Sequence, residues 1–185
     1  MPVPHPEGSE VRVWDIVVRL FHWSLVLCIA TAWISSDDAN TLHTTVGYIA
    51  AALVLFRILW GFVGTKYARF SEFVRSPWAV VRYLQAIFAH RAARHLGHNP
   101  TGGAMILVLL LTIVATAVSG WMLNSDTFWG VSWVQELHGF LANGLILLVF
   151  LHVMGVLAAS IQHRENLLWA MLTGRKRRAA PGDID

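Results

Sequence analysis

The segment ELHGFLANGLILLVFLHVMG (residues 136–155) is an apolar run of membrane-spanning length that contains two histidines, His138 and His152. An α-helix rises about 1.5 Å and turns about 100° per residue, so this spacing separates the two side chains by about 21 Å along the axis and only about 40° around it. A histidine in apolar surroundings costs free energy unless its ring nitrogens are bound. The segment therefore predicts a membrane helix with two satisfied histidines on one face, toward opposite ends.

The composition also indicates a membrane protein. Of 185 residues, 56% are hydrophobic and only 14% are charged, well below the roughly 25% charged residues of an average soluble domain. The single cysteine, Cys28, excludes an intramolecular disulfide, and no C-x-x-C-H motif for covalently attached c-type haem occurs. The N-terminus is polar and contains acids, and no small-residue cleavage site follows the first apolar run, so we expect that run to stay as a membrane anchor.

Four apolar segments have the length needed to cross a bilayer. They leave too little polar sequence to cover them in water, so we expect an all-α integral membrane four-helix bundle. The residues HNPTGG (98–103) are expected to break the chain before the third span. The expected spans are 16–34, 43–62, 103–123 and 136–161, within a domain of residues 14–174 that lies between an N-terminal tail (1–13) and a basic C-terminal tail (175–185).

The charges predict the orientation of the spans. All fourteen Lys and Arg residues lie in the N-terminal flank up to Arg19, in and around the long loop between spans two and three, or at the C-terminal end of the chain. The two other loops, residues 35–42 and 124–133, contain acids and no basic residue. The positive-inside rule therefore predicts that both termini and the long loop are cytoplasmic.

The long loop is too charged to cross the membrane. Its apolar residues recur at helical spacing beside Arg82 and Arg91, which indicates an amphipathic helix at the cytoplasmic membrane interface. A soluble linker helix is the alternative. The apolar positions are Trp78, Val81, Leu84 and Phe88.

Four of the nine histidines lie within the predicted spans or at their ends, and they form two depth-matched pairs. His43 and His138 lie at the outer starts of spans two and four, whereas His22 and His152 lie toward the cytoplasm in spans one and four. The other five are expected in or near water: His5, His90, His95, His98 and His163.

Two imidazoles from facing helices can hold a haem iron between them, so the pairs predict two haem sites. Taken alone, a membrane histidine more often forms a hydrogen bond between helices than binds a metal. A zinc or copper transporter would gather three or four ligands at one depth, and a proton relay would use buried carboxylates. Small residues near the histidines leave room for a macrocycle, although glycines also simply let helices approach. These are Gly47, Gly139, Gly144 and Gly155.

The haem propionates need positive charge or hydrogen-bond donors if they are partly buried. Arg19 and Arg57 are the candidate contacts on the cytoplasmic side, and ordinary snorkelling of both side chains to the interface is the alternative. With two protein ligands, neither iron would have an open position for oxygen, so the haems are expected to carry electrons.

Five stretches of the chain resemble the bacterial cytochrome b561 and nickel-hydrogenase b-type cytochrome superfamily, including VWDIVVRLFHWSLV (13–26) and RENLLWAMLTGRKR (164–177). The others are residues 42–70, 98–112 and 136–156. The resemblance implies a di-haem cytochrome of the bacterial inner membrane that passes electrons between quinones and a redox partner. It also implies that the axial ligands are His22, His43, His138 and His152.

The resemblance leaves the partner and the reaction open. The expected partners are membrane lipid, quinone and a periplasmic c-type cytochrome or other redox subunit, with no nucleic acid. Some hydrogenase cytochromes have more than the four spans expected here. We expect an electron-transfer component of an oxidoreductase system with no catalytic residue of its own. The alternatives are a superoxide:quinone oxidoreductase and a non-haem transporter or scaffold whose histidines are structural.

Overall fold

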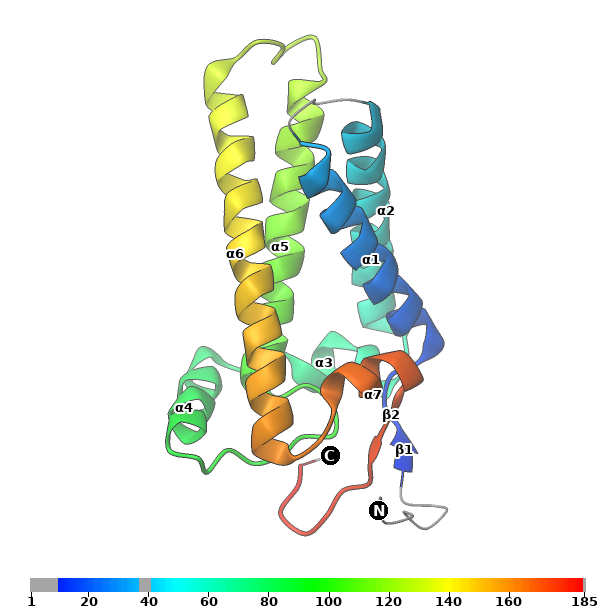
Figure 1. Cartoon of the computed structure of the whole chain (residues 1–185), viewed down its shortest axis with the longest axis vertical. Coiled ribbons are helices and arrows are strands. Elements are labelled where there is room, and N and C mark those ends of the chain that lie inside the picture. Colours follow the sequence, from blue (N-terminus) through cyan, green and yellow to red (C-terminus); the bar gives the residue numbers. More distant parts are fainter. Residues whose placement is uncertain (1–9, 37–40, 185) are drawn as a thin grey trace. The chain divides into compact units, whose positions relative to one another are not determined.

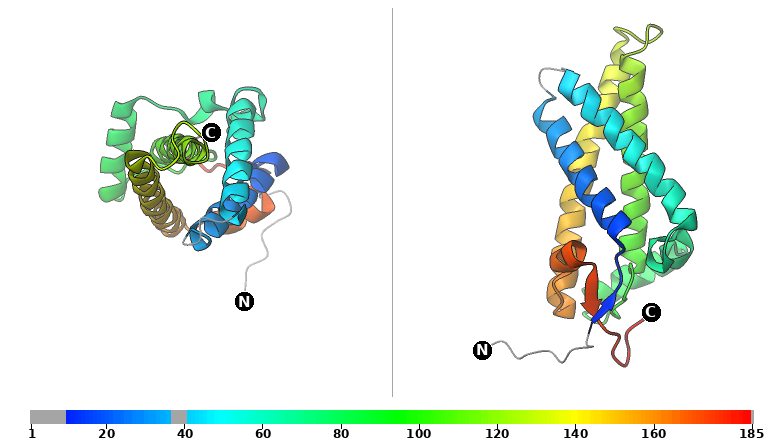
Figure 2. Two further views of the ribbon diagram at one scale, coloured as in Figure 1. Left: turned by 90° about the horizontal axis from the view of Figure 1, so that it is seen from above. Right: turned by 90° about the vertical axis from the view of Figure 1, so that its right-hand side faces the viewer.

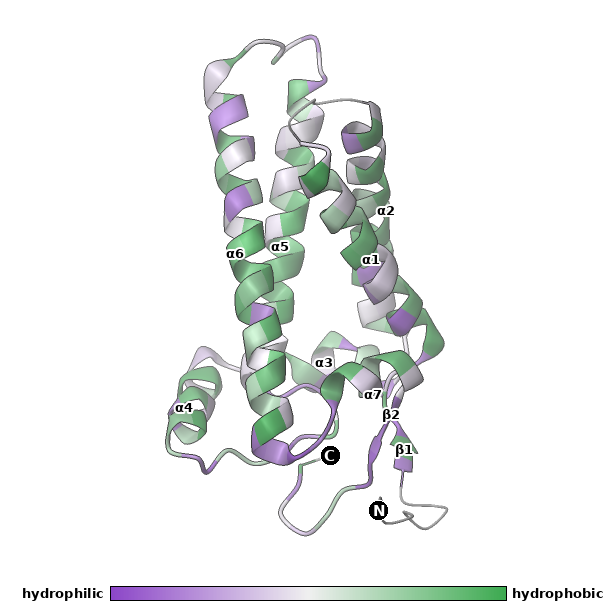
Figure 3. Cartoon of the chain, viewed as in Figure 1, coloured by the Kyte–Doolittle hydropathy of each residue, from purple (hydrophilic) through white to green (hydrophobic). Residues whose placement is uncertain are grey.

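The structure is a computed structural model that describes residues 10–36 and 41–184 (Figure 1). Four long helices dominate it, and each is long and apolar enough to cross a membrane. In the most apolar 18-residue window of each helix, between 6% and 22% of the residues are buried. Hydrophobic residues dominate these four helices along most of their length (Figure 3), as contact with lipid requires. These helices are α1 (Ile16–Ile34), α2 (Thr41–Val63), α5 (Pro100–Leu123) and α6 (Ser132–His163).

The helices begin and end within a few residues of the predicted spans, and the largest differences concern α5 and α6. HNPTGG does not break the chain where we expected. The side chain of Asn99 accepts a hydrogen bond from Gly102 N (2.7 Å) and Pro100 takes the first helical position, so the two glycines lie inside α5. A Cβ on Gly103 would lie 2.4 Å from the backbone oxygen of Phe73, which explains the glycine there.

Helix α6 starts four residues earlier than the predicted span and ends two residues later. Its 32 residues rise about 48 Å, which exceeds the roughly 30 Å of the hydrocarbon core. The ends of α6 therefore extend beyond the apolar layer.

The chain divides into two compact units. The first, which we call the span unit, consists of Leu20–Trp60 and Met105–Leu151 and contains most of the four long helices, which run alongside one another in it (Figure 2). The second, which we call the loop unit, consists of the described residues of Met1–Arg19, Gly61–Ala104 and His152–Asp185.

The loop unit contains the short elements. Helix α7 starts after Asn166, whose side chain accepts from Trp169 N (2.8 Å), and it ends at Gly174, whose φ of 80° is typical of a glycine C-cap. The carbonyl of Gly174 accepts hydrogen bonds from Val13 N (2.9 Å) and Trp14 N (3.1 Å), which ties α7 to the start of the chain. The elements are β1 (Glu10–Arg12), the 3₁₀ helix η1 (Lys66–Ala68), α3 (Phe70–Phe73), α4 (Pro77–Phe88), α7 (Leu167–Thr173) and β2 (Arg175–Arg177).

Strands β1 and β2 belong to the segments that we expected to be an N-terminal tail and a basic C-terminal tail. The two strands instead pair antiparallel, with Val11 opposite Lys176. Behind them, Val13 and Trp14 pack with Ala170 in a small apolar core. Residues 1–9 and 185 of the expected tails lie outside the described residues, as do residues 37–40 of the first loop.

A buried arginine holds the C-terminal segment in the loop unit. Arg94 is 5% exposed and donates to Glu165 through Nε (3.1 Å) and Nη2 (2.6 Å), and to Asp183 through Nη1 (2.5 Å). Ile184 exchanges backbone hydrogen bonds with Arg94 (2.8 Å) and Leu96 (2.9 Å). Burial alone would raise the pKa of Glu165, but the hydrogen bonds from Arg94, the charges of Lys176 and Arg94 and the hydrogen bond from Arg177 N together outweigh it, so the pKa lies below its usual range.

Lys176 extends this network. Its ammonium donates to the carbonyls of Leu96 (2.9 Å) and His95 (3.3 Å) and lies 3.9 Å from Glu165. Burial lowers the pKa of Lys176 to about 8, although Glu165 acts in the opposite direction. The basic C-terminal segment thus has a defined structure up to Ile184.

Candidate functional site

The structure brings together one of the two predicted histidine pairs. His43 lies in the first turn of α2 and His138 in the second turn of α6, both in the span unit. Their ring centroids are 6.1 Å apart and their ring planes are inclined by 78°. These two side chains, 95 positions apart in the sequence, therefore face each other from two different helices.

Both rings are held through the same nitrogen. His43 Nδ1 lies 2.8 Å from the carbonyl of Ala32, and His138 Nδ1 lies 3.1 Å from the carbonyl of Thr116 and 3.0 Å from the hydroxyl of Ser119. A carbonyl can only accept, so each Nδ1 carries the proton and donates. Each Nε2 is then the unprotonated nitrogen, which is the form of imidazole that binds a metal.

The separation of the rings fits a metal ion held between them. A coordinating histidine nitrogen lies about 2 Å from a transition metal, and the ring centre lies about 1 Å further, so two axial imidazoles have centroids about 6 Å apart. The 6.1 Å between His43 and His138 agrees with this. Two ligands on opposite sides leave the plane between them for a macrocycle, which is the arrangement of a bis-histidine haem.

Space beside the two histidines fits the same group. A Cβ on Gly47, one turn after His43, would meet no atom within 4 Å, and the same holds for Gly139 and Gly144 of α6. These three glycines therefore leave space open near the two histidines, as a macrocycle would require.

Gly120 has a different role. A Cβ at this position of α5 would lie 3.0 Å from Cε1 of His138, which is tighter than most real contacts. The glycine therefore lets the imidazole of His138 lie against the α5 backbone. With Thr116, Ser119 and Ala32, it forms the surroundings of the pair that sequence reasoning missed. The available signal was the small and polar series T-x-x-S-G of residues 116–120.

The second predicted pair is divided between the two units. His22 belongs to the span unit, where its ring makes an edge contact with Trp23 at 5.2 Å between centroids. His152 begins the last segment of the loop unit, within α6. Their pairing stays a prediction from sequence.

The two arginines predicted to contact propionates differ in their surroundings. Arg57, in the span unit, is 4% exposed although it carries a charge within an apolar helix. Arg19, in the loop unit, donates through Nη2 to the carbonyl of Leu172 near the end of α7. Arg19 therefore also holds α7, and a Cβ on Gly174 would lie 3.3 Å from it.

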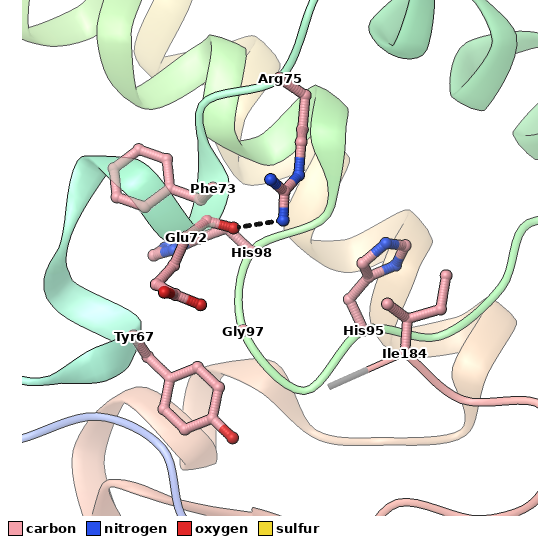
Figure 4. Close-up of a pocket in the computed structure, with 8 residues that line it drawn as sticks. All are labelled: Tyr67, Glu72, Phe73, Arg75, His95, Gly97, His98 and Ile184. Atoms are coloured by element: carbon pink, nitrogen blue, oxygen red, sulfur yellow. Dashed lines mark hydrogen bonds between the residues drawn. The ribbon is translucent and has the colours of Figure 1, made fainter.

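A pocket in the loop unit contains none of the four candidate ligands (Figure 4). His98 lies there with its ring 4.5 Å from that of Trp14 and 5.0 Å from that of Phe73, and the ring of His95 lies 5.3 Å from that of Tyr83. Both were expected in or near water, but both are half-buried against aromatic rings. The pocket is lined by Tyr67, Glu72, Phe73, Arg75, His95, Gly97, His98 and Ile184.

A metal site built from three or more side chains is not found in residues 10–36 and 41–184. Within these ranges, no group of three or more His, Cys, Asp or Glu side chains could hold a metal ion. A zinc or copper transport site would need such a group.

Comparison with known proteins identifies relatives of this chain. The protein is similar to the Probable Ni/Fe-hydrogenase 1 B-type cytochrome subunit of Escherichia coli (strain K12), with 28% identity over 141 residues that cover 62% of this chain and 60% of that protein. It is 24% identical over 215 residues to the Probable Ni/Fe-hydrogenase B-type cytochrome subunit of Rhizobium leguminosarum bv. viciae, covering 92% of this chain and 90% of that protein.

A further relative with the same description, from Azotobacter vinelandii, is 24% identical over 213 residues, covering 90% of this chain and 88% of that protein. No solved structure matches the chain significantly. The sequence profile of the family described as "Prokaryotic cytochrome b561" matches residues 13–174. Because this match includes all four membrane helices and the facing histidines, the chain belongs to the prokaryotic cytochrome b561 family and is a multi-pass b-type cytochrome of the bacterial inner membrane.

Proposed function

We propose that this protein carries electrons across the membrane, between the quinone pool and a periplasmic redox partner, through two bis-histidine b haems. The observation that carries the proposal is the pair His43 and His138, whose rings have the separation and the Nδ1 hydrogen bonds of two axial ligands. In the proposed orientation this pair lies on the periplasmic side. His22 and His152 are the proposed ligands on the cytoplasmic side.

Each residue of the first pair has a defined task. His43 and His138 would hold the iron through Nε2, while the carbonyls of Ala32 and Thr116 fix the tautomer and the ring planes. Haem b supplies a one-electron iron couple when bound. With two protein ligands, the bound iron would have no open coordination position for oxygen or substrate. The site is therefore suited to electron transfer.

Arg57 is the better candidate for a propionate contact on the cytoplasmic side. A buried charge in a membrane span is costly and marks a functional position. A propionate would supply opposite charge to a side chain that is only 4% exposed. Arg19 is the second candidate. Its guanidinium also donates a hydrogen bond to the carbonyl of Leu172.

The periplasmic partner is proposed to have a basic docking face. The described part of the α5–α6 connection and the start of α6 contain Asp126 and Glu136, and residues 95–163 contain no Lys or Arg. A c-type cytochrome or the redox subunit of a hydrogenase are the two partner classes that we propose. The second is suggested by the names of the relatives, and the chain spans only 60% of the length of the Escherichia coli protein.

Counting the haems tests the proposal. The purified protein should contain about two b haems per chain in a pyridine haemochrome assay. Replacement of one ligand removes one of two axial bonds and should release that haem, so His43→Ala and His138→Ala should each leave about one haem with the same spectrum. His22→Ala and His152→Ala should each leave the other haem.

His163→Ala is the matched control, because His163 lies at the end of the same helix as His138 and His152. It should retain both haems. A wild-type protein without b haem, or with one haem per chain, would contradict the two-pair assignment. Loss of different haems from His43→Ala and His138→Ala would contradict the pairing.

A further inference from the structure

Helix α4 of the loop unit has two apolar faces, and only one of them packs against the protein. On the packed face Tyr83 is buried and its hydroxyl donates to the carbonyl of Ala93 (2.8 Å). The start of the helix is also defined, since Ser76 Oγ accepts from Ala79 N (3.4 Å) ahead of Pro77. The buried face with Tyr83 and the N-terminal cap at Ser76 therefore fix the orientation of α4 within its unit.

The opposite face exposes large apolar side chains. Phe88 is 81% exposed, Val81 43% and Leu84 36%, and at about 100° per residue these three side chains lie within about 60° of arc. Trp78, next to this arc, is 77% exposed. A contiguous apolar patch of this size marks a surface that something covers.

The surroundings of the patch are strongly basic. Arg75, Arg82 and Arg91 flank it and are exposed. Residues 64–100 contain six Lys and Arg residues, and Glu72 is the single acid. Whatever covers the apolar face must therefore accept positive charge at its border, which favours an anionic surface over a neutral one.

The same unit contains the ends of membrane helices. Its segments include the last residues of α2, the first turn of α5 and the C-terminal third of α6, from His152 to His163. Helix α4 lies across the direction of that part of α6 (Figure 1, Figure 2). An exposed apolar helix that crosses the direction of this last part of α6, in the unit that contains ends of the membrane helices, is suited to lie at a bilayer surface.

We propose that α4 is an interfacial helix that binds anionic lipid. Val81, Leu84 and Phe88 enter the boundary between head groups and acyl chains, and Arg82 and Arg91 contact the phosphate groups of acidic lipids. The occupant is the lipid surface, so no partner protein is needed to cover this face. This proposal is independent of haem ligation.

The test uses the full chain in nanodiscs made from phosphatidylcholine with increasing fractions of phosphatidylglycerol. In a Cys28→Ala background, Phe88→Cys carries an environment-sensitive fluorophore, and brominated lipids serve as quenchers. We expect quenching at least threefold stronger than for a label at Arg178→Cys, an exposed position of the C-terminal segment. Quenching should increase with the phosphatidylglycerol fraction and decrease with salt.

Charge variants test the second part. Arg82→Gln with Arg91→Gln should abolish the dependence on phosphatidylglycerol, whereas Arg178→Gln, which removes charge elsewhere in the unit, should preserve it. Circular dichroism and gel filtration verify folding. A label at residue 88 that is no more quenched than the control would overturn the proposal and leave the face to a protein partner. Quenching that changes neither with the phosphatidylglycerol fraction nor on replacement of Arg82 and Arg91 would overturn the preference for anionic lipid.

Discussion

The surroundings of His138 show how single residues prepare a ligand. Ser119 is 2% exposed, its hydroxyl donates to the carbonyl of Thr116 (2.9 Å), and its oxygen lies 3.0 Å from His138 Nδ1. The Nδ1–H group of His138 is therefore shared between a carbonyl and a hydroxyl. In the proposed haem site, two acceptors would make the imidazole a more basic ligand, which would stabilise the oxidised state of the iron.

Ser119→Ala removes one of these acceptors and leaves the other. We expect both haems to be retained and the midpoint potential of one haem to rise by a few tens of millivolts, since a hydrogen bond of this kind contributes roughly 1 kcal/mol. A redox titration followed in the visible spectrum measures this. Thr112→Ala is the control, because that hydroxyl donates to Val108 within its own helix. Unchanged potentials in Ser119→Ala would refute the assigned role.

At the scale of elements, the C-terminal segment is held by charge. Arg94 is buried between Glu165, which follows α6, and Asp183, which follows β2. Burial raises the pKa of Glu165, but the hydrogen bonds and charge of Arg94, with Lys176 and Arg177 N, together outweigh it, so the pKa lies below its usual range. The hydrogen bond from Ala180 N, then Arg94, lowers the pKa of Asp183. Both carboxylates therefore bind protons more weakly when the segment is docked than when it is released.

The segment should consequently undock in acid. Its stabilisation is complete above the ordinary pKa of Glu, about 4.3, and is lost as the pH falls below that value, because protonation leaves Arg94 buried without its counter-charges. Hydrogen exchange of residues 175–184, corrected for intrinsic rates, should accelerate about tenfold between pH 5 and pH 3.5. Glu165→Gln should exchange rapidly already at pH 6. Equal protection of the wild type at both pH values would show that the ion pairs do not hold the segment.

At the scale of the whole molecule, the distribution of charge is uneven. All Lys and Arg residues belong to the N-terminal flank, the long loop with its adjoining helix ends, or the C-terminal end. The acids Asp126 and Glu136 have no basic residue near them in the sequence. Such a distribution steers a basic partner toward one end of the protein.

Electron exchange with a basic periplasmic c-type cytochrome should therefore depend on salt. Stopped-flow measurement should show a second-order rate that falls roughly tenfold between 10 mM and 200 mM salt, since surface charges are screened over this range. Asp126→Asn with Glu136→Gln should flatten the dependence, and Glu72→Gln should leave it unchanged. A rate that does not respond to salt would contradict an acidic docking face.

Much of the fold was predictable because it depends on local sequence. The bounds of α1 agree with the predicted span, since a membrane requires an apolar run of fixed length. The earlier start of α5 follows from the cap at Asn99, which is also a local signal. The strands β1 and β2 were not predictable, because three-residue strands carry little pattern and gain their stability from pairing across the chain.

The sequence by itself determined the four membrane helices, and it predicted which histidines share a depth, because hydrophobic length, charge and helical spacing are properties of a single segment. It determined the family as well, through motifs along most of the chain. Only the tertiary structure decided that His43 and His138 face each other at 6.1 Å and that Ala32, Thr116 and Ser119 hold their Nδ1 atoms. Those contacts join different helices, and their distances depend on how the helices are rotated and packed.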